Sequence, residues 1–207
     1  MKDNKLKKRY LICIIALIGF TIISFLLLTN RLDTFDSIIY EIIKHIRCDF
    51  FDIFFKTITY LGNTLPVVII TITLLIYLNK EDRIILGSSM IITLCVNQLI
   101  KYLVKRPRPP LEERLITQGG YSFPSGHSMM ALCLYGVLIY FVVTKIKSKK
   151  KQIVFTILLS LIILLIGISR IYVRVHYPSD VVGGFLITIT ILVINISLLK
   201  KYIEKEQ

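Results

Sequence analysis

The sequence predicts an all-α integral membrane protein, a bundle of six transmembrane helices with one or two amphipathic interfacial helices. Apolar residues make up 55% of the 207 residues, whereas charged residues make up 19% and gather in clusters. Several apolar runs approach the ~20 residues with which a helix crosses a bilayer core about 30 Å thick. The net charge of +13 comes mainly from basic residues at the ends of these runs. That placement is typical of topology signals and of contact with anionic head groups, and it argues against a nucleic-acid partner.

The six expected spans form one membrane domain over residues 1–207. The first follows a basic tail, as in a signal peptide, but its apolar run is long and no small-residue cleavage site follows, so we expect a retained helix. The four cysteines have no metal-binding spacing, and we expect them to be small buried apolar side chains. The expected spans are about residues 10–29, 64–79, 84–103, 125–144, 152–169 and 180–199.

The segment at about residues 34–60 has the periodicity of an amphipathic helix. Apolar residues recur at steps of three and four, and charged residues lie on the other side. We expect one or two helices in the outer membrane interface, or alternatively a helix packed over the bundle. The apolar positions are Phe35, Ile38, Ile39, Ile42, Ile43 and Ile46, and the charged positions are Asp36, Glu41, Lys44 and Arg47.

The basic residues also predict the side of the membrane that each loop faces. Lysine and arginine concentrate in the N-terminal tail, in residues 145–151 and in the C-terminal tail. An even number of spans places these segments on one side, and the positive-inside bias makes that side cytoplasmic. We therefore expect a multi-pass protein of the plasma membrane whose segments 30–63, 104–124 and 170–179 face outward.

Three polar clusters interrupt the apolar pattern, and the parity of the spans brings all three to the outer face. Two outer segments are more basic than the positive-inside rule predicts, and charges placed against the topological trend usually have a function. Their basic residues are Lys105, Arg106, Arg108, Arg114, Arg170 and Arg174. The clusters run from Lys101 to Pro109, from Pro124 to His127 and from Ser169 to Asp180.

The residue types in these clusters suit an anion with several oxygens. Lys101, Arg108 and Arg170 offer cationic donors, and the planar fork of arginine matches phosphate. Ser125 and Gly126 precede a long helix, whose free N–H groups and positive dipole end favour an anion. The clusters therefore predict a phosphate site at the outer face.

Two of the three histidines lie in these clusters and suggest catalysis. His176 with Asp180 resembles the base and orienting carboxylate of a catalytic triad, and the imidazole can itself attack phosphorus. His127 is then available as a general acid for the leaving oxygen. Acidic groups near the site are too few for a magnesium or two-metal site. Taken singly, each of these residues is more often structural, and their joint occurrence on one face is what favours an enzyme.

These residues resemble the signatures of the type 2 phosphatidic acid phosphatase (PAP2) superfamily, which shares its site with vanadium haloperoxidases. The signatures K-x6-R-P, P-S-G-H and S-R-x5-H-x3-D stand here as Lys101…Arg108-Pro109, Pro124-Ser125-Gly126-His127 and Ser169-Arg170…His176…Asp180. Arg106-Pro107 does not fit the first signature, because the residue seven positions before Arg106 is Leu99.

The resemblance implies a role for each residue. His176 would form a phosphohistidine with support from Asp180, and His127 would protonate the leaving group. No metal or other cofactor would be needed. The phosphate would be held by Lys101, Arg108, Ser125, Gly126 and Arg170.

The sequence therefore favours a lipid phosphate or pyrophosphate phosphatase whose active site faces outward. Among substrates, undecaprenyl diphosphate is the first choice from the resemblance to short six-span bacterial members, and phosphatidylglycerol phosphate and phosphatidic acid follow closely. A lipid-phosphate transporter or flippase is the main alternative, although the charges collect at one face rather than at mid-membrane. A non-catalytic membrane scaffold and a haloperoxidase-type reaction are further alternatives.

Overall fold

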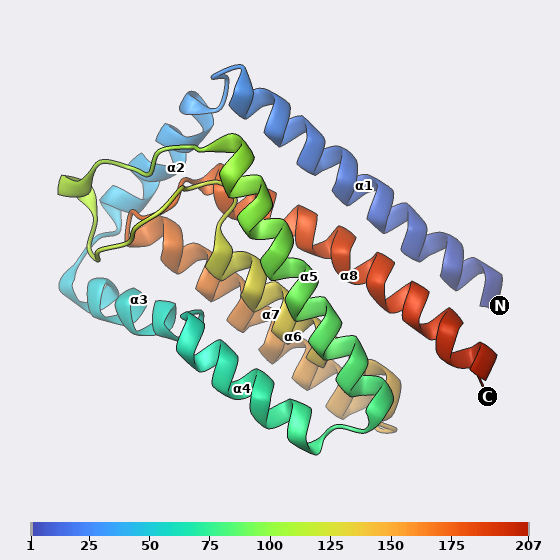
Figure 1. The fold of residues 1–207 in the computed structure, drawn as a ribbon. Coiled ribbons are helices and arrows are strands. Elements are labelled where there is room, and N and C mark those ends of the chain that lie inside the picture. Colours follow the sequence, from blue (N-terminus) through green and yellow to red (C-terminus); the bar gives the residue numbers. More distant parts are fainter. Residues whose placement is uncertain (1, 207) are drawn as a thin grey trace.

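The computed structural model describes residues 2–206, with side chains described for residues 7–202. Over this range the secondary structure is helical with no strand, which confirms the predicted all-α class (Figure 1). The elements are α1 (Lys2–Leu28), α2 (Asp33–His45), α3 (Asp49–Leu61), α4 (Thr64–Tyr77), α5 (Lys80–Val104), η1 (Leu111–Glu113), α6 (Gly126–Lys145), α7 (Lys149–Tyr172) and α8 (Pro178–Glu206).

Five helices, α1, α5, α6, α7 and α8, are each long and apolar enough to cross a membrane, close to where the sequence places them. The remaining expected span, 64–79, is α4, which has 14 residues. At a rise of 1.5 Å per residue, α4 measures about 21 Å and is shorter than the ~30 Å bilayer core. Helix α3 continues it across a bend of 42°. A bent pair of helices therefore replaces the straight sixth span, and α2 remains the separate amphipathic helix.

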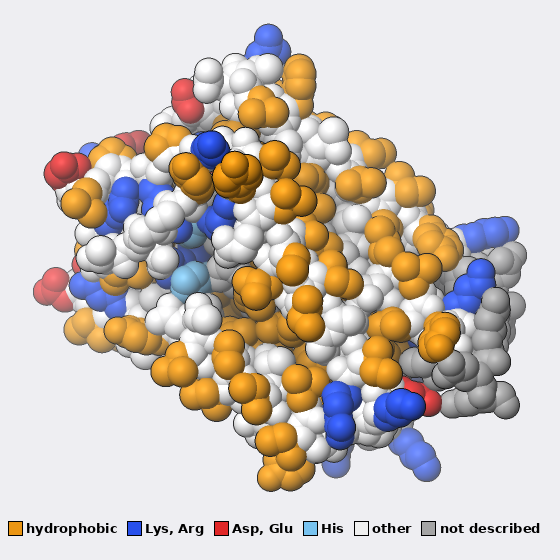
Figure 2. Space-filling view, in the orientation of Figure 1, with side chains coloured by type: hydrophobic (Ala, Val, Ile, Leu, Met, Phe, Trp, Pro, Cys, Tyr) orange, Lys and Arg blue, Asp and Glu red, His pale blue; other side chains and the backbone are white. Residues whose placement is uncertain are grey.

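Helix α6 lies at the centre of the bundle and contacts α4, α5, α7 and α8. It is apolar on nearly every side, as expected of a helix enclosed by others. Its side chains Ala131, Leu134 and Val137 are fully buried and pack with Leu86 of α5 and Ile166 of α7. Helix α1 packs along α8 at the edge of the bundle (Figure 1). Large apolar side chains cover much of the outer surface in Figure 2, as a lipid-facing surface requires.

Close packing on α8 positions the loop that precedes α6. A Cβ atom at Gly183 would lie 2.7 Å from the ring of Phe123, and one at Gly184 would lie 3.2 Å from the carbonyl oxygen of Ser125. Both glycines therefore let the loop lie directly on the helix. The loop between α7 and α8 is held by a second apolar cluster, in which Val173 and Val175 pack with residues of α2 and α3.

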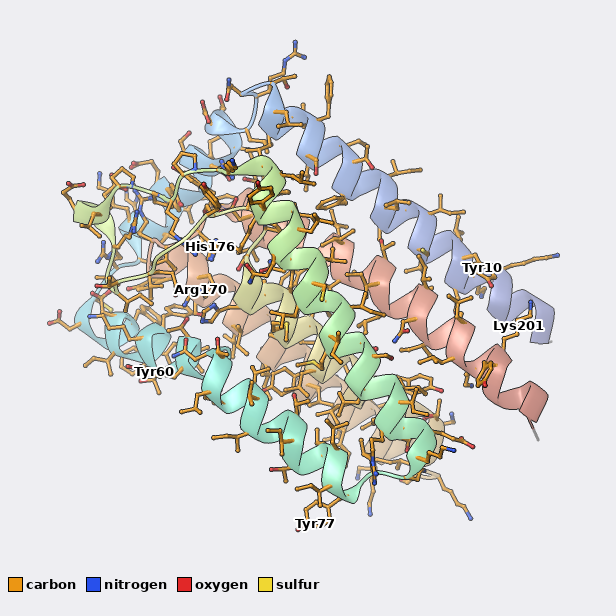
Figure 3. The ribbon with its side chains drawn as sticks, viewed as in Figure 1. Tyr10, Tyr60, Tyr77, Arg170, His176 and Lys201 are labelled. Atoms are coloured by element: carbon orange, nitrogen blue, oxygen red, sulfur yellow. The ribbon has the colours of Figure 1, made fainter. Side chains whose placement is uncertain are left out.

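The two ends of the bundle differ in kind. The N-terminus, the C-terminus and the loop between α6 and α7 lie at one end, and the long loops lie at the other (Figure 1). Tyr10 and Lys201 mark the first end in Figure 3, and His176 lies near the second. Lys145 of α6 forms an ion pair with Asp82 of α5 at the first end. The three basic segments therefore share one end of the bundle, as the parity of the spans predicts.

Candidate active site

The three polar clusters converge at the end of the bundle that carries the long loops. They surround a cavity of about 300 Å³. Its polar wall includes Lys101, Arg108, Gly126, His127 and His176. In Figure 2, histidine surface lies in a hollow among basic side chains at this end. Lys101 and His176, which are 75 positions apart in the sequence, thus face the same cavity.

The other wall of the cavity is apolar. Val67 and Val68 of α4, Leu94 of α5 and Met130 of α6 line it. Val68 and Leu94 are also exposed on the outer surface of the bundle. The cavity therefore extends from the cationic end toward the lipid-facing surface between α4 and α5.

His176 lies in the short loop between α7 and α8 and is 1% exposed. Its Nδ1 is 3.4 Å from Oδ2 of Asp180, and its Nε2 is 3.0 Å from a terminal nitrogen of Arg108. A guanidinium group only donates hydrogen bonds, so Nε2 accepts and the ring proton is on Nδ1. Burial, followed by the charges of Arg108, Arg170 and Lys101, lowers the pKa of His176 well below its usual 6.5. The imidazole is therefore neutral, with its Nε2 lone pair on the cationic side.

Asp180 is fully buried in the first turn of α8 and is held by three donors. Its Oδ2 accepts a hydrogen bond from the hydroxyl of Ser122 and another, 2.8 Å long, from the backbone N–H of Tyr177. This reach back to the residue before the helix is half of a capping box. Its Oδ1 accepts from Arg106 at 2.6 Å. The same carboxylate therefore starts α8 and faces His176.

Arg108 and Lys101 are aimed at the cavity by backbone carbonyl groups. Nε of Arg108 donates to Gly119 and Gly120, and one terminal nitrogen donates to Val175 at 2.7 Å. Nζ of Lys101 donates to the carbonyl oxygen of Tyr121 at 2.5 Å. Burial lowers the pKa of Arg108 to about 10, so the group stays charged at neutral pH. Dipoles that orient a cation before an anion arrives are the basis of a preorganised site.

Arg170 is fully buried next to His176 (Figure 3). Its two terminal nitrogens donate to Thr59 of α3 and to the side-chain oxygen of Gln118. Its Nε is a buried donor with no acceptor within the described part of the chain. Because an unsatisfied buried donor is costly, this nitrogen favours an acceptor oxygen from outside the protein.

Ser125 and Gly126, which were both expected to bind phosphate, have different surroundings at the start of α6. The Ser125 hydroxyl accepts a hydrogen bond from the Ser128 hydroxyl and caps the helix. The backbone N–H of Ser125 donates to the carbonyl oxygen of Asp180 at 3.0 Å and anchors the start of α6 on α8. Gly126 lines the cavity. N–H groups in the first turn of a helix have no acceptor within it. The backbone that starts at Gly126 therefore faces the cavity directly, and a contact between the Ser125 side chain and phosphate stays a prediction.

His127 follows in the same first turn and lines the cavity. Its Nε2 is 2.7 Å from Oδ1 of Asn63, which lies at the bend between α3 and α4. A carbonyl oxygen only accepts, so Nε2 carries a proton in this arrangement. The bend between α3 and α4 thus supplies the partner that orients His127.

Sequence reasoning missed four side chains that contact the site. Ser122 and Arg106 hold Asp180, Asn63 orients His127, and Asp36 of α2 bonds Arg106. Arg106 alone had a signal, as one of the basic residues in an outer segment. Glu112 and Glu113 in the loop before α6 line a separate outer pocket with Arg174.

No group of three His, Cys, Asp or Glu side chains among residues 7–202 is placed to hold a metal ion. A reaction that needs no metal stays a prediction.

Known proteins resemble this chain over most of its length. Residues 83–204 match the family model described as the PAP2 superfamily. Phosphatidylglycerophosphatase B of Bacillus subtilis is 34% identical over 172 residues, which cover 80% of this chain and 84% of that protein. The crystal structure of a transmembrane PAP2 type phosphatidylglycerolphosphate phosphatase from Bacillus subtilis matches with a TM-score of 0.79 and 30% identity, over 94% of this chain and 97% of that one. Aquifex aeolicus LpxE matches with a TM-score of 0.65 and 28% identity, over 77% and 93%.

Proposed function

The chain belongs to the PAP2 superfamily and is a multi-pass membrane lipid phosphatase, and we propose that it dephosphorylates phosphatidylglycerol phosphate through a phosphohistidine at His176. The observation that carries the mechanism is the orientation of His176, whose unprotonated Nε2 lies on the cationic side of the ring while Nδ1–H faces Asp180. The substrate is proposed from the similar Bacillus subtilis protein and crystal structure, both of which are phosphatidylglycerol phosphate phosphatases by name. Undecaprenyl diphosphate, the substrate that the sequence analysis favours, is the competing substrate in the test below.

In the first step, Nε2 of His176 attacks phosphorus, and the bond between phosphorus and the lipid oxygen breaks. The leaving oxygen takes a proton from His127, which must carry protons on both nitrogens to act as an acid. A bound phosphate dianion near His127 favours that charged form. The phosphorylated ring of His176 is positive, and Asp180 at its Nδ1–H stabilises this charge.

In the second step, a water molecule attacks the phosphohistidine and the bond between phosphorus and nitrogen breaks. His127, now neutral, accepts the proton of that water, and the electron pair returns to Nε2 of His176. Inorganic phosphate then leaves, and both histidines have recovered their starting states.

Lys101, Arg108, Arg170 and the backbone at Gly126 are proposed to hold the phosphate oxygens. Lys101, Arg108 and Gly126 line one cavity. Arg170 is not among the lining residues, and its support is the buried Nε that has no acceptor within the described part of the chain. Phosphoryl transfer depends mainly on positioning and charge stabilisation, which fixed cationic donors supply. The apolar wall at Val67, Val68 and Leu94 gives acyl chains a path between the bilayer and this site.

We propose that the active site faces the outside of the cell and that both termini are cytoplasmic. The basic N-terminal tail, the loop at residues 145–151 and the basic C-terminal tail share the end of the bundle opposite the cavity. A concentration of lysine and arginine marks the cytoplasmic side.

The test is phosphate release by the purified protein in detergent with EDTA present. The substrates are phosphatidylglycerol phosphate, undecaprenyl diphosphate and phosphatidic acid, each with a His176→Ala control. We expect hydrolysis of phosphatidylglycerol phosphate with the highest kcat/KM, and none by the control. Faster hydrolysis of undecaprenyl diphosphate would overturn the substrate, and an active His176→Ala control would overturn the mechanism.

A further inference from the structure

Arg106 connects Asp180 to a second buried carboxylate. One terminal nitrogen donates to Oδ1 of Asp180 at 2.6 Å, and the other donates to Oδ2 of Asp36 at 2.8 Å. The side chains of Arg106, Asp36 and Asp180 are 9%, 4% and 0% exposed. Cζ of Arg106 also lies over the ring of Tyr177, 3.9 Å from the ring centre. Charge, hydrogen bonds and stacking therefore fix Arg106 in one orientation.

Asp36 reaches this network from α2, the amphipathic helix outside the bundle. Its Oδ1 accepts from the backbone N–H of Ser179 at 2.9 Å, and its Oδ2 accepts from the Ser179 hydroxyl at 2.8 Å. Ser179 lies in the first turn of α8, where an acidic group satisfies free N–H groups and interacts well with the helix dipole. Asp36 thus caps the helix that carries Asp180.

We propose that Asp36 and Arg106 form a positioning unit for Asp180, which makes α2 part of the catalytic apparatus. The inference rests on the function proposed above for His176 and Asp180. Neither Asp36 nor Arg106 lines the cavity that would hold the phosphate. Both act through Asp180 and are positioning residues.

The division of the Asp180 carboxylate explains what the unit does. Arg106 occupies Oδ1, so Oδ2 is left for Ser122, Tyr177 and the Nδ1–H of His176. An arginine fork readily bonds both oxygens of one carboxylate. Asp36 prevents this by holding the second nitrogen of the fork. Without Asp36, that nitrogen is free to bond Oδ2 and to compete with His176.

The burial and charge of Arg106 fit this role. Burial alone would lower the pKa of Arg106, but Asp180 and Asp36 outweigh burial and raise it above its usual value. The group is therefore always charged where it meets Asp180. A lysine here would keep the charge but not the planar fork that serves two carboxylates.

The test compares kcat and KM for Arg106→Gln, Arg106→Lys and Asp36→Asn in the full-length protein in detergent. Lys105→Gln and Asp33→Asn are matched controls, because these neighbouring charged side chains are exposed. Thermal stability and elution as a single species establish that each variant is folded. Arg106→Gln is also introduced into the Asp180→Asn protein. The rate of the double variant is compared with that of Asp180→Asn alone, on an activated aryl phosphate with enzyme in excess.

We expect Arg106→Gln and Asp36→Asn to lower kcat on the order of 10- to 100-fold, the range typical of groups that orient a functional residue, with KM nearly unchanged. Arg106→Lys should recover part of the loss, and both controls should match the wild type. In the Asp180→Asn background, Arg106→Gln should have little further effect, because its route of action is already gone.

An unchanged kcat in Arg106→Gln would overturn the proposal. The proposal would also be overturned if Arg106→Gln lowered the rate equally in the wild-type and Asp180→Asn backgrounds. A rise in KM at constant kcat would overturn it too, because it would mean that Arg106 contacts phosphate directly. If Arg106→Gln does not fold, Arg106→Lys and Asp36→Asn decide by the same criteria. The proposed function fails separately, if His176→Ala stays active. The positioning proposal alone fails if His176→Ala and Asp180→Asn are inactive while the Arg106 and Asp36 variants are normal.

Discussion

Arg108 and His176 are joined by a hydrogen bond of 3.0 Å between a guanidinium nitrogen and Nε2. Because arginine cannot accept, the bond assigns the lone pair to Nε2 and the proton to Nδ1. One side chain that is expected to bind the phosphate therefore also sets the tautomer of the proposed nucleophile. When phosphate arrives, its oxygens can take over the Arg108 donors and leave Nε2 free to attack.

The first prediction concerns pH. A protonated imidazole has no free lone pair, so activity should fall as pH decreases through the pKa of His176. That pKa lies well below 6.5, because of burial and then the charge of Arg108. The wild-type kcat/KM should therefore fall only well below pH 6.5. Removing the Arg108 charge should raise the pKa, and in Arg108→Gln the acid limb should move to higher pH.

A pH profile with one aryl phosphate for both proteins checks this, because the ionisation of the substrate is then common to the two curves. Arg174→Gln is the control, since Arg174 is near His176 in sequence but is not one of the charges that lower its pKa. An acid limb that is the same in all three proteins would contradict the assignment.

The second prediction concerns Arg170, whose free Nε is expected to meet a phosphate oxygen. Arg170→Lys should weaken inhibition by vanadate by about 10-fold or more, because lysine offers a point charge in place of an oriented fork. The measurement is the vanadate inhibition constant. Arg174 instead stacks on Tyr40, so Arg174→Lys should have the same vanadate inhibition constant as the wild type. Equal vanadate affinity in Arg170→Lys would remove Arg170 from the phosphate site.

The third prediction concerns Asn63 and the orientation of His127. General acids typically contribute about 10²- to 10⁴-fold to the rate, and a misaligned acid loses part of this. Asn63→Ala should therefore lower kcat on a lipid phosphate by about 10-fold or more. It should have much less effect on an aryl phosphate, whose leaving group needs no proton.

Asn79→Ala is the matched control, because Asn79 also precedes a helix but caps α5 at the other end of the bundle. It should lower thermal stability without changing kcat. Equal losses on the two substrates in Asn63→Ala would show that Asn63 does not act through His127.

The fourth prediction concerns topology. Thr117 is exposed in the loop before α6, and Lys147 is exposed in the loop between α6 and α7. In a protein with Cys48→Ser, Thr117→Cys should react with an impermeant thiol reagent in intact cells. Lys147→Cys should react only after the membrane is permeabilised. The reverse pattern would invert the proposed orientation.

The fold was largely predictable because the thickness of the bilayer sets the length of apolar sequence that each membrane-spanning helix needs. Apolar length gave α1, α5, α6, α7 and α8 to within a few residues. The bend at Gly62 and Asn63 was not predicted, since those residues also suit the start of a helix. Whether α3 continues α4 depends on packing against α7, which a linear pattern does not contain.

The candidate site was predictable where its residues are close in sequence. His176 and Asp180 share one turn, and Arg108, His127 and Arg170 follow from motif spacing. Asp36 was not predictable as a site residue, because periodicity groups it with Glu41 on the polar side of α2. The structure separates them, since Asp36 is buried against α8 and Glu41 is exposed. Ser122 and Asn63 also acquire their partners only through tertiary contacts.

Trapping of the phosphoenzyme tests the central claim most directly. His127→Ala removes the group that activates water, so a phosphohistidine should form from a ³²P-labelled aryl phosphate and break down slowly. We predict acid-labile, base-stable label on the peptide that contains His176, stronger in His127→Ala than in the wild type and absent from His176→Ala. Label on another residue, or unlabelled protein during continued hydrolysis by His127→Ala, would contradict the account.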